Sequence, residues 1–277
     1  TAEQLKELGI EVSIAPVDKR GFVRVDELKK LIRKETVLVS VMAVNNEVGS
    51  IQPIQEISDL LNDFPKIHFH VDAVQAIGKV PFSQWLTGRV DFATFSAHKF
   101  HGPRGTGFIY WKKGRRLAPL LTGGGQERNQ RSGTENVPGI VAMAKALRLS
   151  LEIKEQKPEQ TQRLKEALIH ALKSYDKVTI FSEGTDYAPH ILCFALKGIR
   201  GEVLVHALEE KQIFVSTTSA CSSRKHMASS TLHAMHVPND LATSAIRISL
   251  DENNSLAEVE QFMIIFKQLY KKFSAIN

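Results

Sequence analysis

Two patterns of apolar and polar residues alternate along this chain: short β-branched runs and helical spacing. Short β-branched runs at 37–44 and 67–71 predict buried strands, and the apolar spacing at 54–64 between them predicts a helix. Further strands are expected at 91–96, 106–110, 178–182, 191–195, 213–216 and 245–249. Strands that alternate with helices in this way form βαβ units with a parallel sheet, so the pattern predicts an α/β fold.

The character of the pattern changes near residue 155. One helical stretch is expected from about 138 to 174, followed by shorter strands, a helix at 202–210 and a closing helix at 256–273 with apolar residues at i, i+3, i+4 and i+7. We therefore expect a large domain at 1–154, built on a mostly parallel sheet, and a smaller α+β domain at 155–277. Ligands in such folds bind where strand ends meet the domain interface.

Composition narrows the class of protein. The 277 residues are 43% hydrophobic and 24% charged, and no apolar run reaches the ~20 residues of a membrane span. Two cysteines cannot form a disulfide framework, which favours the reducing cytoplasm. The net charge of +6 is well mixed, so the basic stretch 112–116 is interpreted as a solvated turn and no nucleic-acid partner is expected. Thr1 already lies in an amphipathic helical pattern, as expected of a fragment.

Two strand ends carry candidate chemistry. Asp72 ends the strand at 67–71, and Gln75 follows it. Asp72 is interpreted either as a helix N-cap or as a carboxylate paired with a cationic ring nitrogen. Lys99 follows the strand at 91–96; it is either a surface lysine or an amine whose pKa is lowered in a crevice, able to form a Schiff base with an aldehyde. Ser96 and His98 beside it could donate hydrogen bonds to a phosphate.

A glycine-rich segment at 123–136 precedes the expected long helix. Thr134 lies near the helix N-terminus, where backbone N–H groups favour an anion; the alternative is a loop in which Thr134 is an ordinary N-cap. The segment matches neither a Walker A loop nor the dinucleotide-binding fingerprint.

The two cysteines lie in different surroundings. Cys193 lies in an apolar run and is expected to be buried, whereas Cys221 lies in a Ser- and Thr-rich stretch followed by the basic residues 224–226, a setting that lowers a thiol pKa and makes a nucleophile. Zinc binding by Cys221, His226, His233 and His236 is disfavoured, because no second thiol or carboxylate completes the set.

Arg247 interrupts the apolar strand at 245–249, and its neighbours face the opposite side. It binds either a ligand carboxylate through its planar fork or a structural carboxylate within the small domain.

Taken together, these segments resemble the pyridoxal-phosphate enzymes of fold type I, in the class V aminotransferase superfamily, and among them the group I cysteine desulfurases. The resemblance covers essentially the whole chain. It rests on six motifs in the family's order, at 44–49, 70–75, 96–99, 131–134, 219–221 and 246–249.

The resemblance implies pyridoxal 5'-phosphate as cofactor and assigns it seven contacts: Asn46, Asp72, Gln75, Ser96, His98, Lys99 and Thr134. Lys99 would hold the cofactor and shuttle the Cα proton, while Asp72 would pair with the ring nitrogen. Asn46 and Gln75 would contact the ring hydroxyl region. Ser96 and His98 would bind the phosphate, together with Thr134 from the partner subunit of a homodimer.

The resemblance also implies a reaction and its partners. Arg247 would hold the carboxylate of L-cysteine, and Cys221 would take the sulfur as a persulfide, leaving L-alanine. The sulfur acceptor would be an iron–sulfur scaffold or a tRNA-thiolating enzyme. No membrane partner and no resident metal are expected, although Cys221 could serve as a transient iron–sulfur ligand. Two alternatives are another class V enzyme (an aminotransferase or selenocysteine lyase) and a truncated, non-catalytic binding module.

Two departures from the family pattern stand out. The family's N-terminal portion, with a ring-stacking histidine and a phosphate-binding threonine, has no counterpart in this sequence, so neither role is assigned. Thr218 stands where family members often have glycine, which is expected to stiffen the segment before Cys221.

Overall fold

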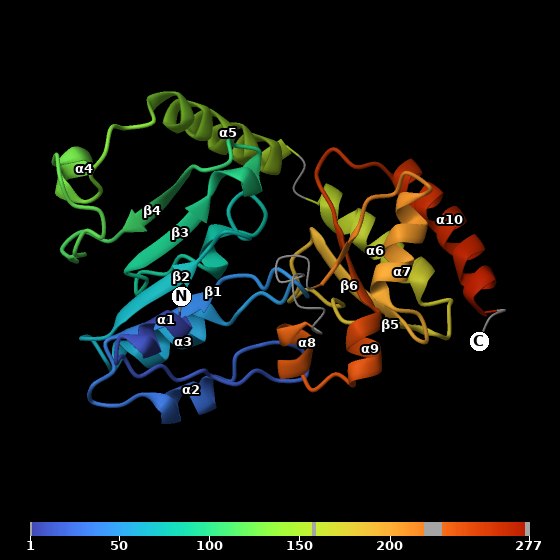
Figure 1. Ribbon diagram of the computed structural model, residues 1–277, viewed down its shortest axis with the longest axis horizontal. Helices are drawn as coiled ribbons and strands as arrows, with labels where there is room; N and C mark the ends of the chain where they lie inside the picture. The colour runs from blue at the N-terminus through green and yellow to red at the C-terminus, as the bar shows by residue number, and fades with distance from the viewer. Residues whose placement is uncertain (1, 157–158, 219–228, 275–277) are drawn as a thin grey trace.

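The computed structural model describes residues 2–156, 159–218 and 229–274, which contain two four-stranded sheets lying side by side (Figure 1). The first sheet has the order β1 (Leu38–Met42), β2 (His68–Asp72), β3 (Phe92–Ser96) and β4 (Gly107–Trp111). The first three strands are parallel and β4 is antiparallel to β3. The mostly parallel sheet of an α/β fold is thereby confirmed.

The helices α2, α3 and α5 pack apolar side chains on the core of this first sheet. The helix α3 (Ile54–Asn62) connects β1 and β2 and buries Ile54, Ile57 and Leu61. The helix α5 (Val137–Gln156) contributes Met143 to the same core, while α1 (Ala2–Glu7) and α2 (Val25–Leu31) precede β1. Along β2 the side chains alternate as expected, with Phe69 and Val71 buried and Asp72 exposed.

The second sheet has the order β5 (Val178–Ile180), β6 (Ile191–Leu196), β8 (Ala245–Ser249) and β7 (Ser216–Thr217), with antiparallel pairing throughout. The helices α6 (Gln160–Leu172), α7 (Gly201–Glu209) and α10 (Leu256–Ser274) pack their apolar stripes on it and form a separate core. The arrangement is of the α+β kind. The domain boundary at residue 154 stays a prediction.

Two elements of the structure differ from those expected from the sequence. The helical stretch expected at 138–174 is two helices, α5 and α6, and the sequence carries Pro158 between them; proline lacks the N–H that a helix interior requires. The strand expected at 213–216 is instead β7 at Ser216–Thr217, and Ile213 and Val215 before it pack on the second core. Five short elements lie below the length at which periodicity is informative: η1 (Phe82–Gln84), η2 (Ala97–Phe100), α4 (Gln126–Asn129), α8 (Ser230–Ala234) and α9 (Asn239–Ser244).

A buried carboxylate joins the amino ends of β2 and β3 to the end of β4. Asp91 is fully buried and accepts hydrogen bonds from the Phe69 N–H (2.9 Å), Arg89 Nη1 (2.8 Å) and Arg115 Nε (2.7 Å). Burial by itself raises the pKa of Asp91, but these hydrogen bonds hold that pKa below its ordinary value. The interpretation of 112–116 as a solvated turn is therefore wrong for Arg115.

None of the helices in the described part of the chain combines the length and the apolar character needed to cross a membrane.

Candidate functional site

Asp72 and the segment 96–99 leave the first sheet at the same edge. The strands β2 and β3 are parallel neighbours in which Asp72 is paired with Thr94, and the Ala73 N–H donates to the Thr94 carbonyl at 3.1 Å. Asp72 is the last residue of β2, and Ser96 is the last residue of β3. Polar groups therefore collect at the carboxyl edge, where parallel sheets bind ligands.

Asp72 is exposed, and its Oδ1 accepts the Val74 N–H at 3.0 Å. The residues that follow form turns and not a helix, so the interpretation of Asp72 as a helix N-cap is wrong; the bond instead closes a turn and fixes the carboxylate at the end of the strand. The other oxygen, Oδ2, accepts none of the hydrogen bonds found among the described residues. Asp72 can therefore accept the Val74 N–H through Oδ1 and still bind a ligand through Oδ2.

Lys99 lies in the short helix η2, which buries Ala97 and Phe100 against the first core and leaves Lys99 half-buried and His98 exposed. A second lysine is close by. Burial first and the charge of Lys99 second lower the pKa of Lys79 to about 8. Two amines therefore share this edge of the sheet, and Lys79 was not among the residues expected from the sequence.

Gln75 is held by a histidine from the second half of the chain. Gln75 Oε1 and His190 Nε2 are 3.3 Å apart, and His190 is 5% exposed. Burial first, and then nearby cations including Lys79, lower the pKa of His190 well below its ordinary value, so its ring is neutral at physiological pH. The other ring nitrogen, Nδ1, has no hydrogen-bond partner among the described residues. The available signal in the sequence was a lone histidine before an apolar strand, which is weak.

Arg247 of β8 and Asn46 of the loop after β1 come together. The Nη1 of Arg247 donates to the Asn46 carbonyl at 2.8 Å, while its Nε is buried without a hydrogen-bond partner in the described chain. Beside them, burial raises the pKa of Glu47, which accepts a hydrogen bond from the Ser229 hydroxyl. Arg247 forms no ion pair within the described part of the chain, and its unpaired Nε points to a ligand acceptor.

Thr134 is not brought to the other candidates. It is exposed and lies three residues before α5, and the side chain that accepts a hydrogen bond at this helix start is Asn136, from the Gly139 N–H at 3.1 Å. The alternative that Thr134 is the N-cap is therefore wrong. The anion-binding role of Thr134 stays a prediction.

Of the two cysteines, the structure describes Cys193 but not Cys221. Cys221, with the basic residues 224–226, lies outside the described residues. Cys193 is fully buried in β6, and burial, with Glu47 adding to it, raises its pKa far above the ordinary thiol value. Cys193 is therefore inert, as the sequence indicated.

Comparisons with known proteins agree on one family. A model of the family described as "Aminotransferase class-V" matches residues 1–262. The chain is 53% identical over 278 residues to a "NifS/IcsS protein homolog" of Lactobacillus delbrueckii subsp. bulgaricus, covering 100% of this chain and 72% of that protein. It is 38% identical over 274 residues to "Cysteine desulfurase IscS" of Dictyoglomus turgidum, covering 99% of this chain and 69% of the relative.

Solved structures give the same result. A "NIFS-LIKE PROTEIN" matches with a TM-score of 0.88 at 40% identity, over 98% of this chain and 70% of the other. A NifS-like protein from Rickettsia africae matches with a TM-score of 0.86 at 28% identity, over 97% and 72%.

Proposed function

The chain belongs to the class V aminotransferase family, and from this membership we propose that it is a pyridoxal-phosphate-dependent cysteine desulfurase. It takes the sulfur of L-cysteine, releases L-alanine and carries the sulfur as a persulfide on Cys221. The observation that carries the proposal is that β2 ends in the carboxylate of Asp72, while its parallel neighbour β3 is followed at the same end of the sheet by the amine of Lys99 in η2.

The residues at this edge fit the cofactor. Asp72 offers a carboxylate oxygen that its turn does not use, which suits a protonated ring nitrogen. Lys99 offers an amine within the short helix η2, which directly follows the neighbouring strand β3, and Gln75 offers an amide fixed by His190. Ser96 ends β3, His98 lies in η2 and Asn46 lies on the loop after β1, all at this carboxyl end of the parallel strands. Pyridoxal phosphate, when bound, supplies an electron sink for the bonds at the substrate Cα.

The chain's own groups would then divide the work. Lys99 holds the cofactor through Nζ and moves the proton at the substrate Cα. Arg247 binds the substrate carboxylate, and its bond to the Asn46 carbonyl fixes the direction of the guanidinium. The Cys221 thiolate attacks the substrate sulfur: an S–S bond forms, the substrate C–S bond breaks, and its electron pair stays with the alanine carbon, which then takes a proton.

A homodimer is part of the proposal. Large apolar side chains are exposed around α4 and the start of α5: Leu117, Leu120, Leu121, Val137, Ile140 and Val141. Patches of this kind mark protein–protein interfaces. Thr134 lies in the same segment and is exposed, which suits a residue that completes the site of a partner subunit.

The sulfur acceptor is proposed to be an iron–sulfur scaffold or a tRNA-thiolating enzyme in the cytoplasm. Direct binding of nucleic acid is not part of the proposal, because the positive charge is mixed with acidic residues along the chain.

The test follows L-alanine formation from L-cysteine by the cofactor-loaded chain. The Cys221→Ala variant is expected to lose it and Lys99→Ala to lose it together with the cofactor absorbance, whereas Cys193→Ala, which removes the buried thiol, is the matched control and keeps it. Alanine formation undiminished in Cys221→Ala would exclude the persulfide mechanism and favour another class V activity. A chain that gives no cofactor absorbance dependent on Lys99 would be a binding module.

A further inference from the structure

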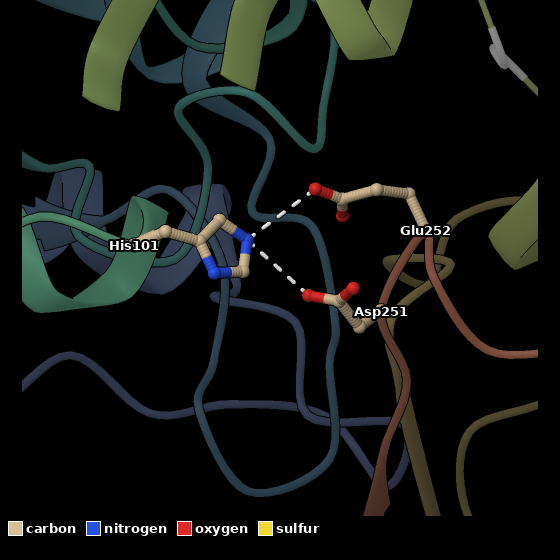
Figure 2. A group of neighbouring side chains, drawn as sticks. All are labelled: His101, Asp251 and Glu252. Atoms are coloured by element: carbon tan, nitrogen blue, oxygen red, sulfur yellow. Dashed lines mark ion pairs between the residues drawn. The ribbon is translucent and has the colours of Figure 1, made fainter. Parts of the chain in front are cut away.

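One imidazole and two carboxylates meet where the loop after η2 approaches the connection from β8 to α10 (Figure 2). Nε2 of His101 lies 3.2 Å from Asp251 Oδ2 and 3.3 Å from Glu252 Oε1. His101 directly follows η2, and both acidic residues lie on the connection from β8 to α10. The three side chains are 54%, 34% and 21% exposed, in that order, so the cluster is open to solvent on one side.

The spacing of these atoms matches metal ligands. Two ligands at about 2.1 Å from a tetrahedral ion lie about 3.4 Å apart, close to both imidazole–carboxylate distances. All three ligand atoms lie within 4.8 Å of one another. A cation bound between the carboxylates of Asp251 and Glu252 would also remove their mutual repulsion and allow their oxygen atoms to approach each other.

The cluster is also held in position by neighbouring groups. Asp251 Oδ1 accepts hydrogen bonds from the Asn253 N–H (2.9 Å) and Nδ2 (2.7 Å), which leaves Oδ2 directed at His101. Such supporting bonds orient ligands in metal sites. Lys79 and Lys154 line one pocket with Glu252, and burial disfavours the charged form of both lysines. Two carboxylates balance the charge of a divalent ion when the imidazole is neutral.

We propose that His101, Asp251 and Glu252 form a binding site for one divalent transition-metal ion, which fastens the loop after η2 to the β8–α10 connection. Imidazole and carboxylate together suit Zn²⁺ and similar first-row ions, with water filling the open position. The ion would link the two halves of the chain two residues from Lys99. This inference does not depend on the proposed function.

The test is calorimetric titration of ZnCl₂ into the cofactor-loaded chain carrying Cys221→Ser, so that no reactive thiol competes. One Zn²⁺ per chain is expected, with an affinity about tenfold or more lower in each of His101→Gln, Asp251→Asn and Glu252→Gln. The same Zn²⁺ is expected to raise the melting temperature of the background chain and not that of the three variants. His206→Gln is the matched control, because His206 pairs with one exposed carboxylate of the described residues, Glu209 (3.3 Å), and it should leave the titration unchanged.

Two results would overturn the proposal. If the background chain takes up no Zn²⁺, the cluster is an ion pair only. If the three variants bind Zn²⁺ as tightly as the background, the ion lies elsewhere. All three side chains are partly exposed, so the variants are expected to fold. Circular dichroism of the metal-free variants checks this, so that a loss of Zn²⁺ binding can be distinguished from a loss of folding.

Discussion

Replacing Arg247 with lysine separates a substrate-binding role from a structural one. Lysine keeps the positive charge but not the planar fork, so it cannot bind a carboxylate through two parallel bonds. In the structure Nη1 is already used by the Asn46 carbonyl, and the buried Nε is unpaired. The Nε side of the fork is therefore the edge available to the carboxylate of L-cysteine.

The expected magnitude follows from the bond that lysine cannot make. A hydrogen bond between charged groups contributes about 1.5–3 kcal/mol, which corresponds to a fall of about 10- to 160-fold in kcat/KM. Because the carboxylate is bound equally before and during the reaction, most of this loss should be a rise in KM for L-cysteine. The assay is initial rates of L-alanine formation over a range of L-cysteine concentrations.

The control is Arg89→Lys, which removes a fork from a structural arginine bound to Asp91, at the amino ends of the strands. It should lower the free energy of unfolding and leave KM unchanged. A change of less than about twofold in kcat/KM for Arg247→Lys, with a loss of stability similar to that of Arg89→Lys, would refute the substrate role.

Three further predictions concern stability and assembly. Asp91→Asn is expected to cost about 3–5 kcal/mol in urea unfolding, because two arginines lose their buried partner. The pKa of Asp91 is lower in the folded chain than in the unfolded chain, so its contribution to the free energy of unfolding is present above the unfolded pKa and is lost as pH falls through the folded pKa. The stability of Asp91→Asn should therefore fall less steeply with acid. An acid profile like that of the unchanged chain would contradict this. Burial lowers the pKa of Lys79 to about 8, so the free energy of unfolding should rise between pH 8 and the pKa of lysine in the unfolded chain, about 10.4. Lys79→Met should be more stable at pH 7 and should lose part of that rise in unfolding midpoints measured across this pH range. A variant that keeps the full rise would exclude Lys79 as its source. Leu120→Asp, at a side chain 95% exposed, should shift sedimentation toward monomer, whereas Phe214→Asp, at one 73% exposed outside the patch, should not; a dimer that persists in Leu120→Asp would argue against this interface.

The strands were predictable because their signals are local. The alternation along 68–72 and the apolar runs of β3, β6 and β8 depend on neighbouring residues alone, and the structure has strands there. From strand ends and their parallel order, the meeting of Asp72 with the Lys99 segment could also be expected.

The contacts that escaped prediction are those that join distant parts of the chain. His190 reaches Gln75 across 115 positions and Arg247 reaches Asn46 across 201, and no periodicity encodes such pairs. The three partners of Asp91 come from one strand and two connecting segments, so its burial could not be inferred from one segment. Tertiary packing, which the linear pattern does not contain, decides all of these.

The enclosure of Cys193 within β6 has a practical consequence for labelling experiments. The chain has two sulfhydryl groups, and this one is shielded from reagents for as long as the fold persists. A maleimide probe, or an isotopic sulfur tag found after a single turnover, can accordingly be assigned to position 221 without removing the other cysteine. Uptake of a second equivalent then reports unfolding.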